Sequence, residues 1–405
     1  MTDYKALYAE KLISAEELAE QVESGWILGM DTAPSQAPAI MNAIAARVKS
    51  SDIKGVQVQT LLDAYPFEFY TDPDMFGKMT GYSWFSSGYA RKAINGGWAD
   101  LLPTYYRDIP RHIRAEYEYD AFCIEVSPMD SHGYFSLALN GSYAEAMIDK
   151  AKRVFVEVNE NQPRCLCGTQ LHVSQVDAIV EYNHELPVLP PVAIDEVSQT
   201  IGNLIAEQIP DGACIQLGIG AIPDATGMAL KSKHDLGIHT EMFTDSMVEL
   251  IECGAVNNSK KQIHRGKSVT TFAYGSKRIY DYVDDNPAIE ILPVDYVNNP
   301  EVICKNDNMI SINAAIEVDF FGQVCAESVG TKHMSGSGGQ IDFVRGACQS
   351  KGGKSFIAFT STAKGGTISK IKPILTPGAV CTTSKNDVDY IVTEYGIAHM
   401  RGRSL

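Results

Sequence analysis

The sequence of 405 residues lacks long hydrophobic runs, and no stretch approaches the roughly 18 consecutive apolar residues of a transmembrane helix. Residues 1–21 are polar, without the apolar core of a signal peptide. An excess of basic charge is missing too, since 34 lysines and arginines stand against 50 aspartates and glutamates, for a net charge of −16. We therefore expect no membrane partner and no general nucleic-acid binding, which needs a basic face.

Several catalytic and metal-binding motifs are absent as well. The nine cysteines are scattered, with Cys165 and Cys167 as the only close pair and no CxxC motif, which fits a reduced, cytoplasmic compartment. No HExxH motif occurs and the nine histidines are dispersed, so we expect no metal site. The GxSxG motif of α/β-hydrolases is missing, which argues against a serine hydrolase triad.

Short runs rich in valine and isoleucine are present along most of the chain, and they alternate with segments of helical periodicity. Ala151–Val158, Ala213–Leu217 and Ser355–Phe359 are examples of the strands that these runs predict. Strands that alternate with helices are typical of an α/β fold with largely parallel sheets.

A cluster of prolines divides the sequence into two comparable halves. It lies within residues 186–194, which we predict to be a linker between an N-terminal domain (1–185) and a C-terminal domain (195–405). Both halves contain a glycine-flanked strand followed by a loop, a proline and a helical pattern, at residues 25–46 and 212–233. This echo predicts two similar open α/β domains, although such short patterns also arise by chance.

A glycine turn is the first candidate for chemistry. Gln216–Gly220 ends a predicted strand with two glycines, and Pro223 stands where a helix begins. Glycines allow a ligand to approach the backbone closely, and a helix N-terminus offers free N–H groups. A dinucleotide fingerprint needs a third glycine at the position of Pro223, so a nicotinamide or flavin site is excluded here. A tight turn without a ligand remains the alternative for this motif alone.

Glu241 is the second candidate, at the end of the next predicted strand. Ligands of open α/β sheets bind at the carboxyl ends of the strands, so we expect Glu241 beside the glycine turn. There, backbone N–H groups would stabilise an oxyanion while the carboxylate acts as nucleophile on an activated acyl group. The alternative is that Glu241 stabilises a helix N-terminus, but Asp245 is the better candidate for that role. His239 would face the same side as Glu241, and a hydrogen-bonded strand histidine is the favoured interpretation over a substrate contact.

Two further loops are candidates for contacts with an anion. Three glycines within four residues of Ser335–Gly339 suit an anion nest or a close approach to substrate, with a flexible surface loop as the alternative. The loop Ser361–Gly366, with Lys364 inside it and Lys370 beyond it, would suit phosphate groups. A solvated turn is the alternative for this basic loop.

Taken together, these motifs resemble the acetyl-CoA hydrolase/transferase family, and most closely its 4-hydroxybutyrate and butyrate:acetate CoA-transferase branch. The segments that carry the resemblance are Gly218–Pro223, Ile238–Glu241, Gly336–Phe343, Val392–Ala398 and, in the first half, Asp130–Tyr134. The resemblance implies two similar α/β domains, a homodimer, and coenzyme A as a substrate with no permanently bound cofactor. Members of this family continue through a further C-terminal helix, and we expect weaker stability or altered dimerisation where that helix is missing.

The resemblance also implies a role for each matching residue. Glu241 corresponds to the nucleophile that forms an acyl–glutamyl anhydride and then a glutamyl–CoA thioester. The other implied active-site residues are Ile219, Gly339, Asn298 and Glu394. The implied contacts with coenzyme A are Gln216, Leu217, Gly218, Ile219, Gly220, Ile316, Gly338, Gly339 and Lys364. Asn299 stands where the family usually has a histidine, which is a departure from the pattern.

The expected reaction is a ping-pong transfer of coenzyme A between a short-chain acyl-CoA and a carboxylate such as acetate, butyrate or 4-hydroxybutyrate. A carboxylate nucleophile suits this reaction because each exchange conserves a high-energy acyl bond. Two alternatives remain open. An acyl-CoA hydrolase would admit water to the same intermediate, and a non-catalytic CoA-binding protein would keep the glycine loops without a competent Glu241.

Overall fold

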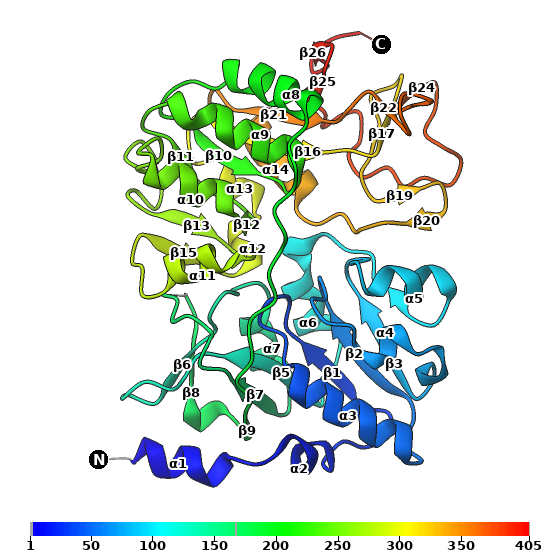
Figure 1. Cartoon of the computed structure of the whole chain (residues 1–405), viewed down its shortest axis with the longest axis vertical. Helices are drawn as coiled ribbons and strands as arrows, with labels where there is room; N and C mark the ends of the chain where they lie inside the picture. The colour runs from blue at the N-terminus through cyan, green and yellow to red at the C-terminus, as the bar shows by residue number, and fades with distance from the viewer. Residues whose placement is uncertain (1–2, 167, 405) are drawn as a thin grey trace.

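The computed structural model describes residues 3–166 and 168–404, so Cys167 of the close cysteine pair lies outside the described residues. The chain forms two lobes, an N-terminal one (blue to green in Figure 1) and a C-terminal one (green to red), each built around a sheet with helices on its faces. This confirms the predicted α/β fold with largely parallel sheets. Among the described residues, no helix combines the length and the apolar character that crossing a membrane requires.

The N-terminal lobe contains a seven-stranded sheet in the order β4-β3-β2-β1-β5-β7-β9, and every neighbouring pair is parallel. Its strands are β1 (Ile27–Met30), β2 (Val56–Thr60), β3 (Met79–Ser83), β4 (Asp100–Leu101), β5 (Ala121–Val126), β7 (Val154–Val158) and β9 (Ala178–Glu181). The other elements of this lobe are α1 (Tyr4–Lys11), α2 (Ala15–Ala19), α3 (Pro38–Ser50), α4 (Glu68–Thr71), η1 (Pro73–Met75), α5 (Ala90–Gly96), η2 (Tyr106–Asp108), α6 (Ile109–Glu116), β6 (Tyr134–Ser136), α7 (Ala144–Lys150), β8 (Gln170–His172) and η3 (Val173–Gln175). Strands β5 and β7 are buried at every position, as expected for parallel strands covered on both faces.

The C-terminal lobe contains a six-stranded sheet in the order β11-β10-β16-β21-β25-β26, which is parallel except for the last pair. Its strands are β10 (Cys214–Leu217), β11 (Gly237–Ile238), β16 (Met309–Ala314), β21 (Lys354–Ala358), β25 (Tyr390–Thr393) and β26 (Gly396–His399). Its helices are α8 (Glu196–Glu207), α9 (Ala221–Ala229), η4 (Leu230–Ser232), α10 (Asp245–Glu252), α11 (Lys277–Val283), α12 (Val294–Val297), α13 (Pro300–Ile303) and α14 (Gln340–Gln349). Short strand pairs lie beside this sheet: β12 (Met242–Phe243) with β14 (Phe272–Ala273), β13 (Ser268–Thr270) with β15 (Ile289–Ile291), β17 (Glu317–Asp319) with β18 (Val324–Cys325) and β24 (Ile371–Lys372), β19 (Ser328–Val329) with β20 (Lys332–His333), and β22 (Thr362–Ala363) with β23 (Ile368–Ser369).

The proline-rich segment connects the two lobes as extended chain between β9 and α8 (Figure 1). It is fixed to the C-terminal lobe, because Leu189 N–H donates to the Gly275 carbonyl at 3.0 Å and the Tyr280 hydroxyl donates to the Pro187 carbonyl at 2.5 Å. It runs from the lobe that contains one large sheet to the lobe that contains the other (Figure 1). The predicted boundaries at 186 and 194 stay a prediction.

The lobes also pack directly on each other. One continuous apolar core includes Ile124 of β5, Ile215 of β10 and Phe272 of β14, so it extends from one lobe into the other. A backbone hydrogen bond of 2.8 Å from Gly141 to Thr271 crosses the same boundary. This packing brings the carboxyl ends of strands from both sheets together around one cavity.

Candidate active site

A cavity of about 280 Å³ lies between the two lobes. Its N-terminal wall includes Leu61 and Leu62, which follow β2, and Phe85, which follows β3. Its C-terminal wall includes the ends of β10 and β16, together with the glycine loop at 335–339. The carboxyl ends of strands from both sheets therefore meet at this cavity, where α/β proteins bind their ligands.

Glu241 lines this cavity, between β11 and β12. The side-chain amide of Asn298 donates to Oε2 of Glu241 at 2.6 Å, and the backbone N–H of Gly339 forms a second hydrogen bond to the carboxylate. Burial raises the pKa of Glu241 to about 7, although both hydrogen bonds lower it. At neutral pH, a substantial fraction of Glu241 is therefore an ionised, poorly solvated carboxylate, which is a reactive state for a nucleophile.

The second glycine loop approaches Glu241 so closely that only glycine fits. A Cβ atom on Gly339 would lie 2.2 Å from Oε2 of Glu241 and 2.3 Å from Nδ2 of Asn298. The preceding residue, Gly338, has a positive φ of 51°, which turns the loop. The glycines predicted at this loop thus allow its backbone to reach the carboxylate.

The first glycine loop offers a free donor. Gly218 continues the β10 ladder through its N–H, which donates to the Ile312 carbonyl at 2.9 Å, and Gly220 turns the chain with a φ of 116°. Between them, the N–H of Ile219 has no acceptor in the part of the chain that the structure describes. Ile219 also lines the cavity with Glu241, and the role of its N–H as an oxyanion donor there stays a prediction.

The N-terminal lobe also forms hydrogen bonds with the second glycine loop. The Ser337 hydroxyl donates to the Thr104 carbonyl at 2.8 Å, and Tyr106 N–H donates to the Gly338 carbonyl at 3.3 Å. Beyond this loop, Asp342 is fully buried in the first turn of α14. Its Oδ1 lies 3.1 Å from Nε of Arg107, the residue after Tyr106. Burial raises the pKa of Asp342 to about 8, while the charge of Arg107 opposes that rise.

The structure brings some of the predicted site residues together and leaves others apart. The predicted residues that line the cavity are Gln216, Leu217, Gly218, Ile219, Glu241, Gly338 and Gly339. Asn298 is outside this lining but donates to Glu241. Gly220 lines a neighbouring cavity. Ile316, Lys364 and Glu394 lie outside the cavity lining, and Glu394 accepts hydrogen bonds from the backbone and hydroxyl of Ser361 at 2.8 and 2.5 Å. Their implied roles stay predictions.

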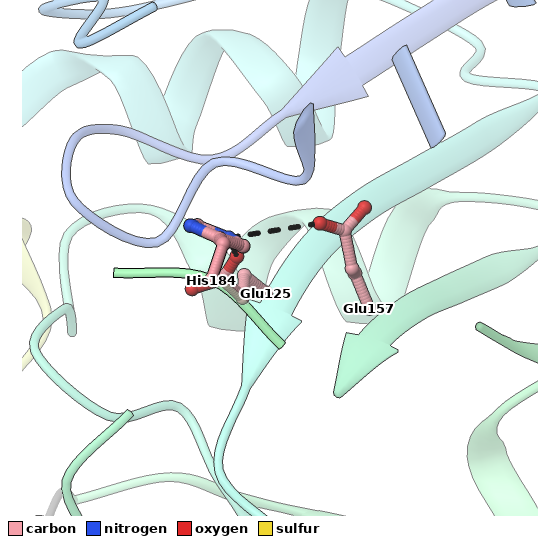
Figure 2. Close-up of side chains that lie close together, drawn as sticks. All are labelled: Glu125, Glu157 and His184. Atoms are coloured by element: carbon pink, nitrogen blue, oxygen red, sulfur yellow. Dashed lines mark hydrogen bonds and ion pairs between the residues drawn. The ribbon is translucent and has the colours of Figure 1, made fainter. Parts of the chain in front are cut away.

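A second cluster of ionisable side chains lies in the N-terminal lobe (Figure 2). Nε2 of His184 is 2.6 Å from Oε2 of Glu125 on β5 and 3.9 Å from Oε1 of Glu157 on β7, and the three possible ligand atoms lie within 4.8 Å of one another. Both carboxylates also have hydrogen-bond donors from the protein. Glu125 accepts from Asn159 and Gln162, and Glu157 accepts from the N-terminal N–H groups of α3.

Burial and the charge of Glu125 raise the pKa of Glu157 to about 8, so Glu157 holds a proton at neutral pH. Because this proton and the hydrogen bonds stabilise the cluster, we assign no ion to it. The three residues are distant in the sequence, at positions 125, 157 and 184, which is why no local motif indicated them.

Comparison with known proteins relates this geometry to a family. Residues 1–190 match the acetyl-CoA hydrolase/transferase N-terminal domain, and residues 275–405 match the corresponding C-terminal domain. The succinyl-CoA:cyclohexane-1-carboxylate CoA transferase of Geobacter metallireducens is 46% identical over 401 residues, which cover 99% of this chain and 91% of that protein. The 4-hydroxybutyrate coenzyme A transferase of Clostridium kluyveri is 44% identical over 405 residues, which cover 100% and 94%. The crystal structure of RipA from Yersinia pestis has a TM-score of 0.94 at 39% identity, covering 100% of this chain and 93% of that one.

A buried carboxylate that shares a cavity with the free N–H of Ile219, where two largely parallel sheets meet, provides groups that acyl transfer needs. The chain belongs to the acetyl-CoA hydrolase/transferase family. The predicted resemblance and the predicted class of enzyme, a CoA-transferase, are thereby confirmed.

Proposed function

We propose that this protein transfers coenzyme A between a short-chain acyl-CoA and a carboxylate by a ping-pong mechanism in which Glu241 is the nucleophile. One observation carries the proposal: the buried carboxylate of Glu241 shares a cavity with the free N–H of Ile219 and is oriented by Asn298. The names of the relatives, which describe CoA transfer to carboxylates, support it.

In the first step, an oxygen of Glu241 attacks the thioester carbonyl of the acyl-CoA. The carbonyl π electrons move onto its oxygen, and the N–H of Ile219 stabilises that oxyanion. When the carbonyl reforms, the carbon–sulfur bond breaks, and the products are coenzyme A thiolate and an acyl–glutamyl anhydride. No net proton transfer is needed, because one anion is consumed and one is released.

In the second step, the thiolate attacks the Glu241 carbonyl of the anhydride. The acid leaves as a carboxylate, and coenzyme A is bound to Glu241 as a thioester. An incoming carboxylate then attacks this thioester, and the same two steps run in reverse. Holding the thiolate and the anhydride together gives the high effective concentration that favours transfer over hydrolysis.

Coenzyme A would extend from this cavity toward the basic loop of the C-terminal lobe. Lys364 is exposed, and its ammonium forms no ion pair with any described residue. Lys372, by contrast, is bound to Glu317 at 2.6 Å. Lys364 is therefore available to pair with a phosphate of coenzyme A, with Ile316 as a further contact.

The lining of the cavity supports an uncharged, short aliphatic acyl group, such as butyryl or 4-hydroxybutyryl. Leu61, Leu62 and Phe85 form an apolar wall, and Met242 and Phe272 add apolar surface near Glu241. Within the described residues, the lining includes no lysine, arginine or histidine, so a second carboxylate on the acyl group would find no cation.

The acceptor dependence of coenzyme A release distinguishes transfer from hydrolysis at the same site. Purified protein is incubated with butyryl-CoA, with and without acetate, and acetyl-CoA and free coenzyme A are quantified by chromatography. We expect acetyl-CoA to form only with acetate, and free coenzyme A to stay below one equivalent per chain without it, since coenzyme A is retained on Glu241 while butyrate leaves. Multiple turnovers to free coenzyme A without acetate would instead establish a hydrolase, and intact butyryl-CoA with bound ligand would indicate a binding protein.

The family resemblance also supports a homodimer, and the scattered cysteines support a cytoplasmic location. Light scattering during size-exclusion chromatography tests the oligomeric state, with an expected mass of twice the 44.2 kDa of one chain.

A further inference from the structure

His239 is a fully buried histidine that has no step in the proposed reaction, although it lies two residues before Glu241. Its backbone is fixed in the sheet region, since its N–H donates to the Ile215 carbonyl at 3.2 Å. Its ring reaches in the other direction, where Nε2 lies 2.8 Å from the Val297 carbonyl oxygen. The ring is therefore hydrogen-bonded, as the sequence interpretation favoured, and the residue lies at an isolated bridge directly after β11.

The contact with Val297 determines the proton position on the ring. A carbonyl oxygen can only accept, so Nε2 must carry the hydrogen. Nδ1 is buried and has no partner among the described residues. Burial lowers the pKa of His239 to about 3, and the charges of Lys261 and His264 act in the same direction. His239 is thus a neutral hydrogen-bond donor over the whole working pH range and not an acid or a base.

The carbonyl that His239 binds belongs to the residue before Asn298. Val297 ends the one-turn helix α12, and Asn298 is its C-terminal cap, with its own N–H donating to the Val294 carbonyl at 2.9 Å. Carbonyl groups in the last turn of a helix lack partners within the helix, and the ring of His239 supplies one. The peptide unit that leads into Asn298 is therefore held at both its oxygen and its nitrogen.

These contacts close a ring of bonds around the nucleophile. The chain runs from Glu241 back to His239, the ring of His239 binds Val297, and the side chain of the next residue, Asn298, returns to Glu241 at 2.6 Å. The imidazole also lies 6.3 Å from the ring of Phe343, which stands one turn along α14 from Gly339. Both hydrogen bonds to the Glu241 carboxylate thus originate in segments that the His239 ring contacts.

We propose that His239 is a positioning residue, whose ring N–H holds the Val297–Asn298 peptide so that the Asn298 amide stays on the Glu241 carboxylate. This inference rests on the proposed role of Glu241 as nucleophile. A residue that merely fills the core would need the volume of the ring but not its donor.

Loss of the donor therefore has a specific electrostatic consequence. The hydrogen bond from Asn298 favours the ionised form of Glu241, so weakening it makes the pKa of Glu241 rise further. Other charged and titratable groups face Glu241 as well: Tyr106 from η2, and Asp342 from α14 with its partner Arg107. The structure shows no contact between His239 and these three residues, so they form the same background in every variant.

The test compares two substitutions that differ in the donor. His239→Gln keeps an amide N–H near the position of Nε2, whereas His239→Leu keeps apolar volume and removes the donor. Glu-labelled protein is titrated by ¹³C NMR, with the Glu241 carboxyl assigned by its loss in Glu241→Gln, and transfer from butyryl-CoA to acetate is measured against pH. We expect His239→Leu to raise the Glu241 titration midpoint by about one pH unit and, through the smaller ionised fraction of Glu241, to lower kcat at pH 6 about tenfold, while His239→Gln stays close to wild type.

The effect of His239→Leu on the Glu241 midpoint, measured in the Asn298→Ala variant, shows whether His239 acts through Asn298. In that background the midpoint is already raised, and His239→Leu should add no further shift. An unchanged midpoint in His239→Leu, equal effects of Leu and Gln, or an undiminished shift in the Asn298→Ala background would each overturn the inference. The NMR titration needs no turnover, so it still decides the role of His239 if the wild-type protein transfers no coenzyme A and the proposed function fails.

Discussion

The amide of Asn298 donates to Oε2 of Glu241 at 2.6 Å, although 57 residues separate them in the chain. Within the described residues, no side chain donates to the other oxygen, Oε1, which faces the space beside Gly338 at 3.6 Å from its ideal Cβ position. The Asn298 amide thus holds Oε2 and the Gly339 N–H also binds the carboxylate, and we expect Oε1, which has no side-chain donor among the described residues, to attack the thioester.

Glu241→Gln should make the protein more stable at high pH, because an amide has no charge to bury. The pKa of Glu241 is raised in the folded state to about 7, so its contribution to stability is present below its ordinary range and is lost as the pH rises through 7. The advantage of Glu241→Gln over wild type should grow by roughly 2–3 kcal/mol between pH 5 and pH 8 and then level off. Urea unfolding at several pH values measures it, and a difference independent of pH would contradict the raised pKa.

Gly339→Ala should abolish most of the activity, because the added methyl group occupies the space of the Glu241 carboxylate and the Asn298 amide. Misplacement of a nucleophile by about 1 Å costs roughly 100-fold in rate, and we expect at least that loss in kcat. Gly88→Ala is the matched control, since nothing lies within 4 Å of its added Cβ. Near-normal kcat in Gly339→Ala would mean that the loop does not touch the reacting carboxylate.

Arg107→Leu should destabilise the protein, because it leaves the Asp342 carboxylate buried without its cation. Breaking a buried pair costs about 3–5 kcal/mol, and we expect roughly 2–4 here since Arg107 is partly exposed. The pKa of Asp342, already raised to about 8, should rise further without Arg107. The loss should therefore be larger at pH 9 than at pH 6, where Asp342 is protonated.

Asp342→Asn is the partner substitution for this ion pair. Combined with Arg107→Leu, it should recover most of the lost stability in the same unfolding measurements. If the double variant were as unstable as Arg107→Leu alone at pH 9, the ion pair could not explain the effect of the first substitution.

Succinyl-CoA should be a poor substrate compared with valeryl-CoA, which has a similar length but no distal charge. The apolar wall of Leu61, Leu62 and Phe85 would desolvate the distal carboxylate without pairing it. We expect kcat/KM for succinyl-CoA to be lower by at least roughly 100-fold, measured with acetate as the common acceptor. Equal values would show that the acyl chain does not occupy this cavity.

The sequence predicted those parts of the site that follow from local pattern and strand order. The glycine turn at 216–220 and the approach of Glu241 to it follow from parallel strands β10 and β11, whose carboxyl ends share an edge. The two-lobed α/β fold follows in the same way from the alternation of strands and helices. Asn298 was indicated only by the family resemblance, since nothing in its neighbourhood marks it as a partner of Glu241.

The contribution of the N-terminal lobe was not predicted. Leu61 and Phe85 are ordinary apolar residues after buried strands, and their place in the cavity depends on how two lobes dock. The pair formed by Arg107 and Asp342 joins residues 235 positions apart, and no local periodicity encodes such a contact. The site residues predicted from the sequence all lie in the second half of the chain, whereas loops of the N-terminal lobe also line the cavity.

Trapping the covalent intermediate on Glu241 tests the central claim most directly. The protein is incubated with butyryl-CoA without an acceptor, reduced with borohydride and digested, and the peptide that contains Glu241 is analysed by mass spectrometry, with Glu241→Gln as the blank. The account predicts that the glutamyl–CoA thioester is reduced to an alcohol, so that the wild-type peptide loses mass at Glu241 and the blank does not. Transfer of coenzyme A to acetate in the same preparation, with Glu241 unmodified, would contradict it.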